Sequence, residues 1–158
     1  MLDIYKASAG SGKTFALTLE YFRTIFASPA EYKKIVDYVL ANPSPRNLGI
    51  LLTICSGMRI GEVCALQWKD IDLDKKTIHI CKTLERIYMP GEDGTFNKAK
   101  THIEIGPPKT SNSDRYIPIL KNIFPLVKKF SAVCNPDYYV CTCGEQYTEP
   151  RTLRNYYE

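Results

Sequence analysis

The stretch from Gly57 to Asp70, GMRIGEVCALQWKD, constrains the fold of this chain more than any other part of it. Its pattern is typical of a helix that ends at a glycine, a sharp turn that carries Arg59, and a second short helix. Glycine allows backbone angles and close approaches that other residues resist, so Gly57 and Gly61 can hold the arginine in a fixed turn. A guanidinium fixed in this way suits a phosphate, but it could equally bond to helix-end carbonyls or to Glu62. The residues alone leave both interpretations open.

Helices are predicted on both sides of this stretch. Ser28 and Pro29 form a capped start for a helix that should run to about Ala41, and Asn42 and Pro43 open a turn after it. A strongly apolar helix should follow and be the most buried one. The predicted ranges of the remaining helices are Arg46–Ser56, Gly61–Trp68, Leu120–Val133 and a last helix that begins at Pro150.

Three segments alternate between apolar and polar residues, as half-buried strands do. They are Thr77–Tyr88, Lys100–Ile105 and Arg115–Ile119. The turn cluster PGEDG, at residues 90–94, separates the first two. The simplest arrangement is a small three-stranded antiparallel sheet beside the helices, which makes the fold class α+β. Three lysines could line one side of this sheet: Lys98, Lys100 and Lys109.

Two motifs resemble those of the tyrosine recombinases, the phage integrase family. GMRIGEVCALQWKDID is similar to the family's first signature box, whose usual form is G-L-R-I-x-E-L-x-x-L-x-W-x-D-I/V-D. PPKTSNSDRYIPI resembles its hairpin, P-K-T-x-x-S-x-R-x-I/V-P-L/I. The resemblance implies that Arg59 is the first catalytic arginine, that Glu62 is the acidic residue accompanying it, and that Lys109 reaches into the DNA. We also expect Lys98, Lys100 and Arg115 to bind DNA.

The resemblance also implies a metal-free reaction on double-stranded DNA. In the family, a tyrosine attacks a DNA phosphate to form a 3′-phosphotyrosine link, arginines hold the phosphate oxygens, and the lysine protonates the departing 5′ oxygen. The His-x-x-Arg box and the nucleophilic tyrosine should follow Glu158. We therefore expect residues 28–158 to be a truncated catalytic domain, inactive alone, that at most binds DNA and other integrase subunits.

Residues 1–27 carry a different motif. Strand-forming residues precede ASAGSGKT, and a helical run follows, which resembles the phosphate-binding loop of superfamily-one helicases. As an alternative function, this loop would bind ATP and magnesium through Gly10, Gly12, Lys13 and Thr14. Such an enzyme needs several parallel strands and a later acidic residue, and no series of this kind follows. The favoured interpretation is therefore a helicase-like segment fused to an unrelated domain.

Composition adds few constraints. The net charge of +4 permits a nucleic-acid partner without demanding one, and no apolar run approaches the length of a membrane span. Cys55 and Cys64 lie in apolar helical contexts and should be small buried hydrophobes. Cys141 and Cys143 lack the spacing of a zinc site. We expect no disulfide scaffold, no metal or other cofactor, and a cytoplasmic location.

Overall fold

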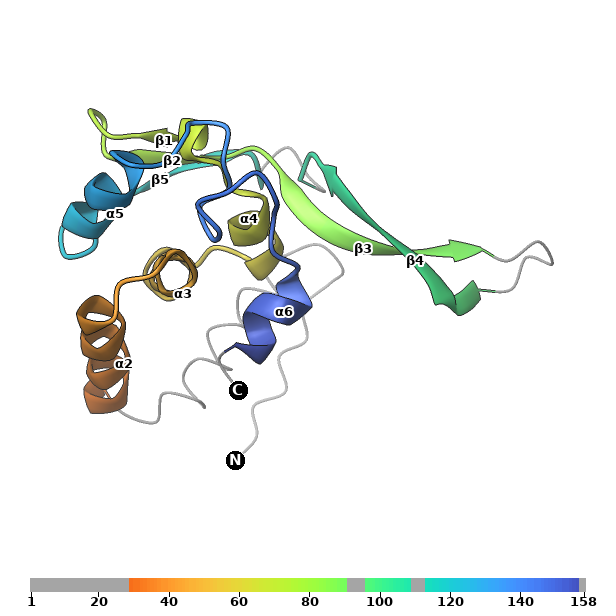
Figure 1. The fold of residues 1–158 in the computed structure, drawn as a ribbon, viewed down its shortest axis with the longest axis horizontal. Coiled ribbons are helices and arrows are strands. Elements are labelled where there is room, and N and C mark those ends of the chain that lie inside the picture. Colours follow the sequence, from red (N-terminus) through yellow and green to blue (C-terminus); the bar gives the residue numbers. More distant parts are fainter. Residues whose placement is uncertain (1–28, 91–95, 109–112, 157–158) are drawn as a thin grey trace, which may run out of the picture. The chain divides into compact units, whose positions relative to one another are not determined.

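The computed structural model describes residues 29–90, 96–108 and 113–156 (Figure 1). The chain divides into two compact units, Met1–Tyr38 and Val39–Glu158. The described residues of the first unit belong to helix α2 (Pro29–Ala41), whose last three residues are counted in the second unit. Its bounds are those that the sequence predicts. None of the helices in the described part of the chain is long and apolar enough to cross a membrane.

Helix α3 (Pro45–Ser56) lies in the second unit and is capped at both ends. The Ser44 hydroxyl accepts a hydrogen bond from the backbone N–H of Asn47 at 3.1 Å, which satisfies a donor of the first turn.

At the other end of α3, Gly57 adopts a left-handed conformation with φ of 64° and donates its N–H to the carbonyl of Thr53. The predicted stop at Gly57 is confirmed. So is the burial of this helix, through Leu48, Leu51 and Leu52.

Helix α4 (Ile60–Ala65) is shorter than the predicted range Gly61–Trp68. The chain becomes extended at Leu66, whose carbonyl accepts a hydrogen bond from the N–H of Val140 at 2.9 Å. A separate 3-10 turn, η1 (Trp68–Asp70), follows, and its Asp70 carboxylate accepts the N–H of Gln67 at 2.9 Å. This second cap and the pairing with a distant segment end the helix early.

The strands form two antiparallel sheets instead of one. The first has the order β1-β2-β5, and the second pairs β3 with β4 (Figure 1). An α+β fold with a three-stranded sheet is confirmed, but the expected membership of that sheet is wrong. The strand bounds are β1 Ile71–Asp72, β2 Thr77–Ile80, β3 Thr83–Pro90, β4 Phe96–Gly106 and β5 Arg115–Pro118.

The predicted strand Thr77–Tyr88 breaks at Cys81 and Lys82. At this break the Lys82 ammonium donates to the side chain of Gln67 at 2.6 Å and pairs with Asp70 at 2.9 Å. These bonds tie the break to η1, and β3 continues into the separate ribbon with β4. The third member of the first sheet is instead β1, which pairs with β2.

The ribbon of β3 and β4 contacts the rest of the unit through α4. At this contact Gly61 lies so close to β3 that an added Cβ would meet the Leu84 carbonyl oxygen at 2.6 Å and the Thr83 hydroxyl at 2.8 Å. The predicted close approach at Gly61 is thereby explained. It fixes the start of α4 against the ribbon.

Helix α5 (Phe124–Ser131) is also shorter than its predicted range, whereas α6 (Pro150–Asn155) begins where the sequence predicts. Helix α5 begins only at the residue before Pro125, because proline lacks an N–H and is accommodated in a first turn. Residues 120–123 form a turn before it, in which the N–H of Ile123 donates to the carbonyl of Leu120. Helix α6 (Pro150–Asn155) begins at Pro150, as predicted.

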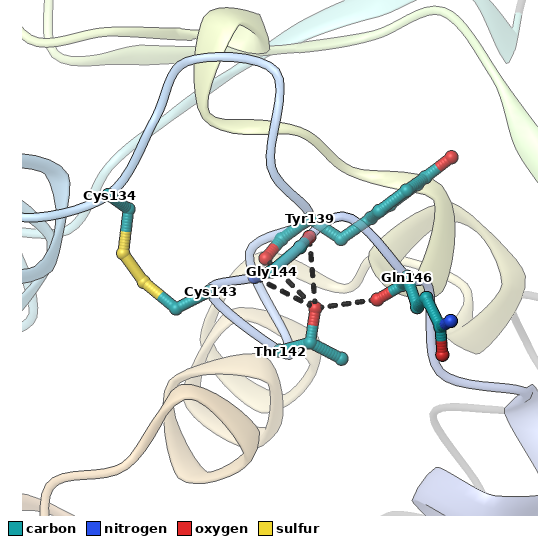
Figure 2. Close-up of a disulfide and its surroundings, with 6 residues drawn as sticks. All are labelled: Cys134, Tyr139, Thr142, Cys143, Gly144 and Gln146. Carbon is teal, nitrogen blue, oxygen red and sulfur yellow. Dashed lines mark hydrogen bonds between the residues drawn. A yellow bond between two sulfur atoms is a disulfide. The ribbon is translucent and has the colours of Figure 1, made fainter.

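A disulfide joins Cys134 and Cys143, whose Cα atoms are 5.7 Å apart (Figure 2). The expectation that the cysteines form no disulfide scaffold is corrected for this one pair. The enclosed loop is also held by the Thr142 hydroxyl, which donates to the carbonyl of Gln146 at 2.7 Å. The loop docks on the segment after α4, where the N–H of Trp68 donates to the carbonyl of Tyr138 at 3.0 Å.

The other cysteines of the described residues are not disulfide-bonded. Cys64 is fully buried, as predicted, and burial raises the pKa of its thiol to about 12. Cys141 is equally buried, and desolvation likewise raises its pKa. Cys55 is only partly buried. Both buried thiols therefore stay protonated near neutral pH and act as small apolar side chains.

The disulfide should stabilise the fold through the short loop that it closes. Chain-entropy arguments give about 2–3 kcal/mol of unfolding free energy for a loop of this size. We expect reduction to lower the urea midpoint accordingly. A variant with Cys134→Ser and Cys143→Ser should match the reduced protein and should not respond to reductant. Equal midpoints for the oxidised and reduced wild type would contradict this.

The close approach at Gly61 predicts a large cost for a single methyl group. Gly61→Ala should lower the unfolding free energy by about 1–3 kcal/mol, because β3 backbone must move to admit the Cβ. Gly106→Ala is the matched control, since nothing lies within 4 Å of the position of its Cβ. Denaturant titration should find the control within about 0.5 kcal/mol of wild type. If both variants unfold alike, the proposed packing of α4 on β3 is wrong.

Candidate functional site

Arg59 stands at the start of α4 with its backbone extended. Its N–H donates to Oε2 of Glu62 at 2.9 Å, and its Nη1 donates to Oε1 of the same carboxylate at 2.9 Å. Glu62 is therefore both the cap of the helix and the anchor of the arginine. The side chain of Arg59 is 56% exposed, whereas that of Glu62 is 1% exposed. The arginine is held through its backbone N–H and its Nη1 group, and more than half of its side chain remains exposed to solvent.

Arg115 reaches the same carboxylate from β5. Its Nη1 donates to Oε1 of Glu62 at 3.0 Å and its Nη2 donates to Oε2 at 2.8 Å, which makes a bidentate fork. Nη1 also donates to the carbonyl of Ser113 at 3.0 Å. The sequence places Arg115 among the DNA-binding residues, and the structure places its guanidinium on Glu62. The sequence analysis did not predict the pairing of Glu62 with Arg115. A glutamate in a first helical turn that becomes buried needs a cation nearby, and this is the signal that could have revealed the pair.

The electrostatics of the cluster favour an ionised carboxylate. Burial by itself raises the pKa of Glu62, but hydrogen bonds from Arg115 and Arg59 outweigh it and hold that pKa below its ordinary value. Two guanidinium groups share one carboxylate, so the cluster keeps a net positive charge. A cation that is fixed and partly exposed can bind a phosphate oxygen.

The other site residues that the sequence predicts lie either on β4 or outside the described residues. Lys98 and Lys100 lie on β4, within the two-stranded ribbon, so they do not belong to the three-stranded sheet whose side they were expected to line. Lys109 lies outside the described residues, in the segment directly before Ser113. The phosphate-loop residues are outside them as well: Gly10, Gly12, Lys13 and Thr14.

Within the ranges that the structure describes, no three histidine, cysteine or acidic side chains are grouped so that they could hold a metal ion. The arrangement that the structure does show is a pair of arginines on one buried carboxylate. Arg59, at a helix start, is more than half exposed, and Arg115 shares the same glutamate.

Comparisons with known proteins show which family the sequence resembles. A sequence model of the phage integrase family matches residues 26–153. A tyrosine recombinase XerC-like protein of Caldanaerobacter subterraneus subsp. tengcongensis is 37% identical over 50% of this chain and 19% of its own length. The ICEBs1 integrase of Bacillus subtilis is 30% identical over 66% of this chain and 25% of its own length. The integrase of Staphylococcus phage L54a is 43% identical over 47% of this chain and 18% of its length.

The chain thus spans a quarter or less of the curated relatives that it matches. Among solved structures, the Tn1549 transposon integrase in complex with transposon right end DNA aligns with a TM-score of 0.48. That alignment has 22% identity and covers 65% of this chain and 30% of the integrase. The family match extends over most of the sequence and includes both motifs and all three residues of the cluster. The chain belongs to the phage integrase family.

Proposed function

We propose that residues 28–158 are part of the catalytic domain of a tyrosine recombinase, which carries out site-specific DNA recombination during integration of a mobile element. The observation that carries this proposal is the outward-facing guanidinium of Arg59, anchored on the buried carboxylate of Glu62. Its ligand would be a phosphate of double-stranded DNA. A transition state with charge on phosphate oxygens is stabilised best by donors that are already in place.

The anchoring leaves donors for the ligand. Glu62 engages the Nη1 group and the backbone N–H of Arg59, and the side chain is otherwise more than half exposed. An arginine has five N–H donors in a planar fork, so the rest of the fork can meet the oxygens of one phosphate. Because Glu62 fixes one edge of the fork, less conformational entropy is lost when the phosphate binds.

Lysines on β4 and before β5 would extend the contact with DNA. Lys98 and Lys100 lie on β4, and Lys109 precedes β5. In the proposed reaction Lys109 protonates the departing 5′ oxygen, whereas Lys98 and Lys100 neutralise backbone phosphates. The covalent step belongs to a tyrosine, and we assign it to none of the described residues. Other integrase subunits are the further partners that such a reaction needs, and the proposed location is the cytoplasm.

DNA binding by this chain tests the proposal directly. Fluorescence anisotropy with a duplex should show salt-sensitive binding that Arg59→Ala and Lys109→Ala weaken by about tenfold or more, as expected for a lost charged hydrogen bond. Each lost phosphate contact should also reduce the slope of log K against log salt by about 0.9.

Lys75→Ala is the control, because Lys75 is exposed and pairs only locally with Asp72 in the turn between β1 and β2. It removes the same charge and should change affinity by less than about twofold, as a solvated lysine does. Absence of binding at low salt would refute DNA binding by this chain. Equal losses for Arg59→Ala and the control would refute the role of Arg59.

The phosphate-loop motif supports a second candidate, nucleotide binding through Lys13 and Thr14 with magnesium. We favour a fusion remnant for residues 1–27, since the sequence lacks the strand series that such a loop requires. We therefore expect millimolar ATP with magnesium to leave the melting temperature unchanged, in wild type and in Lys13→Ala alike. A stabilisation that Lys13→Ala abolishes would establish nucleotide binding instead.

A further inference from the structure

We propose that Arg115 is a positioning residue for Arg59. It shares the Glu62 carboxylate with Arg59, and it also donates to the carbonyl of Ser113 just before β5. This inference rests on the proposed function, because it assigns Arg115 a role in the same phosphate site. It replaces the direct DNA contact that the family pattern implies for Arg115.

The geometry of the carboxylate carries the argument. Oε1 of Glu62 accepts the Nη1 groups of both arginines, at 2.9 Å from Arg59 and 3.0 Å from Arg115. Oε2 accepts the backbone N–H of Arg59 and Nη2 of Arg115, at 2.9 Å and 2.8 Å. Each oxygen is therefore shared between the helix start and β5. The two arginines hold one carboxylate in one orientation.

Because Glu62 is buried, the loss of one arginine should change the position of the other. With 1% of its side chain exposed, Glu62 cannot replace a lost partner by water without rearrangement. Among the described residues, the cations that hydrogen-bond to this carboxylate are Arg59 and Arg115. Removal of Arg115 would therefore leave Arg59 as its single cationic partner there. The guanidinium of Arg59 would then be drawn inward to neutralise it, and fewer of its donors would face a phosphate.

Arg115 itself is poorly placed to bind DNA. Its Nη1 already donates to both Glu62 and the Ser113 carbonyl, and Nη2 donates to Glu62. Its side chain is 30% exposed, about half the value for Arg59. The more exposed cation of the cluster is Arg59, and the hydrogen bonds of Arg115 are directed at the carboxylate and the Ser113 carbonyl.

The bond to Ser113 adds a second link. Ser113 is buried and directly follows residues 109–112, and its carbonyl is held by the same Nη1 that binds Glu62. One guanidinium thus joins the end of the Lys109 segment to the turn of Arg59. These segments lie about fifty residues apart in sequence, and Arg115 is a direct hydrogen-bonded connection between them.

A double-mutant cycle on DNA affinity separates positioning from direct contact. Arg115→Lys keeps the charge and loses the fork, so a positioning role predicts about tenfold weaker binding, whereas a simple phosphate contact would tolerate lysine. In the Arg59→Ala background the same change should cost less than twofold. Losses of equal size in both backgrounds would overturn the inference, as would wild-type affinity in Arg115→Lys.

A second measurement does not depend on DNA. The ¹⁵N and ¹H chemical shifts of the Arg59 Nε–H should differ between wild type and Arg115→Lys, because the guanidinium turns toward the carboxylate when it loses its partner arginine. Arg86→Lys is the matched control, since Arg86 pairs with a different glutamate, Glu149, and should leave the Arg59 signal unchanged. An Arg59 signal that ignores Arg115→Lys would overturn the inference even if the wild type bound DNA.

The two measurements also separate this inference from the proposed function. Failure of wild type to bind DNA, with an Arg59 signal that responds to Arg115→Lys, would refute DNA binding by this chain and leave the positioning role supported. Arg115→Gln is the second variant if Arg115→Lys does not fold, as judged by circular dichroism. It keeps a planar donor without charge and should reproduce the change in the Arg59 chemical shifts.

Discussion

The site depends on one buried carboxylate. Glu62 lies on a helix of only six residues, which has too few backbone hydrogen bonds to be stable alone. Its carboxylate caps that helix, anchors the arginine that precedes it, and bonds to the first residue of β5. A buried charge is costly unless it is fully paired, and here two arginines supply four donors. The same interaction therefore stabilises the helix start and fixes the orientation of the outward cation.

The surroundings of α4 restrict its position further. At its start, Gly61 lets the helix lie directly against the backbone of β3. Just past its end, the backbone of Leu66 and Trp68 pairs with the loop that the Cys134–Cys143 disulfide closes. The short helix is thus held by the ribbon on one side and by a covalently closed loop beyond its C-terminus. This is how segments distant in sequence can give one arginine a defined orientation.

Local signals in the sequence were sufficient for the helix boundaries that depend on caps. Gly57, Pro29 and Pro150 start or stop helices where predicted, because their backbone preferences act within a few residues. The helix and strand ends that the sequence predicts wrongly depend on residues that are distant in sequence. Leu66 leaves its helix to pair with Val140, and the strand beyond Ile80 breaks where Lys82 bonds to η1. Hydrophobic alternation continues across that break, so periodicity alone could not reveal it.

The same distinction applies to the site. Sequence reasoning found Arg59 and Glu62 together because they share one helical turn, and it left open whether the arginine bonds to Glu62 or faces a phosphate. The structure shows that the first contact is made while more than half of the side chain stays exposed. The two alternatives are therefore compatible, because an anchored edge and a free edge belong to one planar group. Arg115 was assigned to DNA since its partner lies on another element, and only the fold brings that partner within hydrogen-bonding distance.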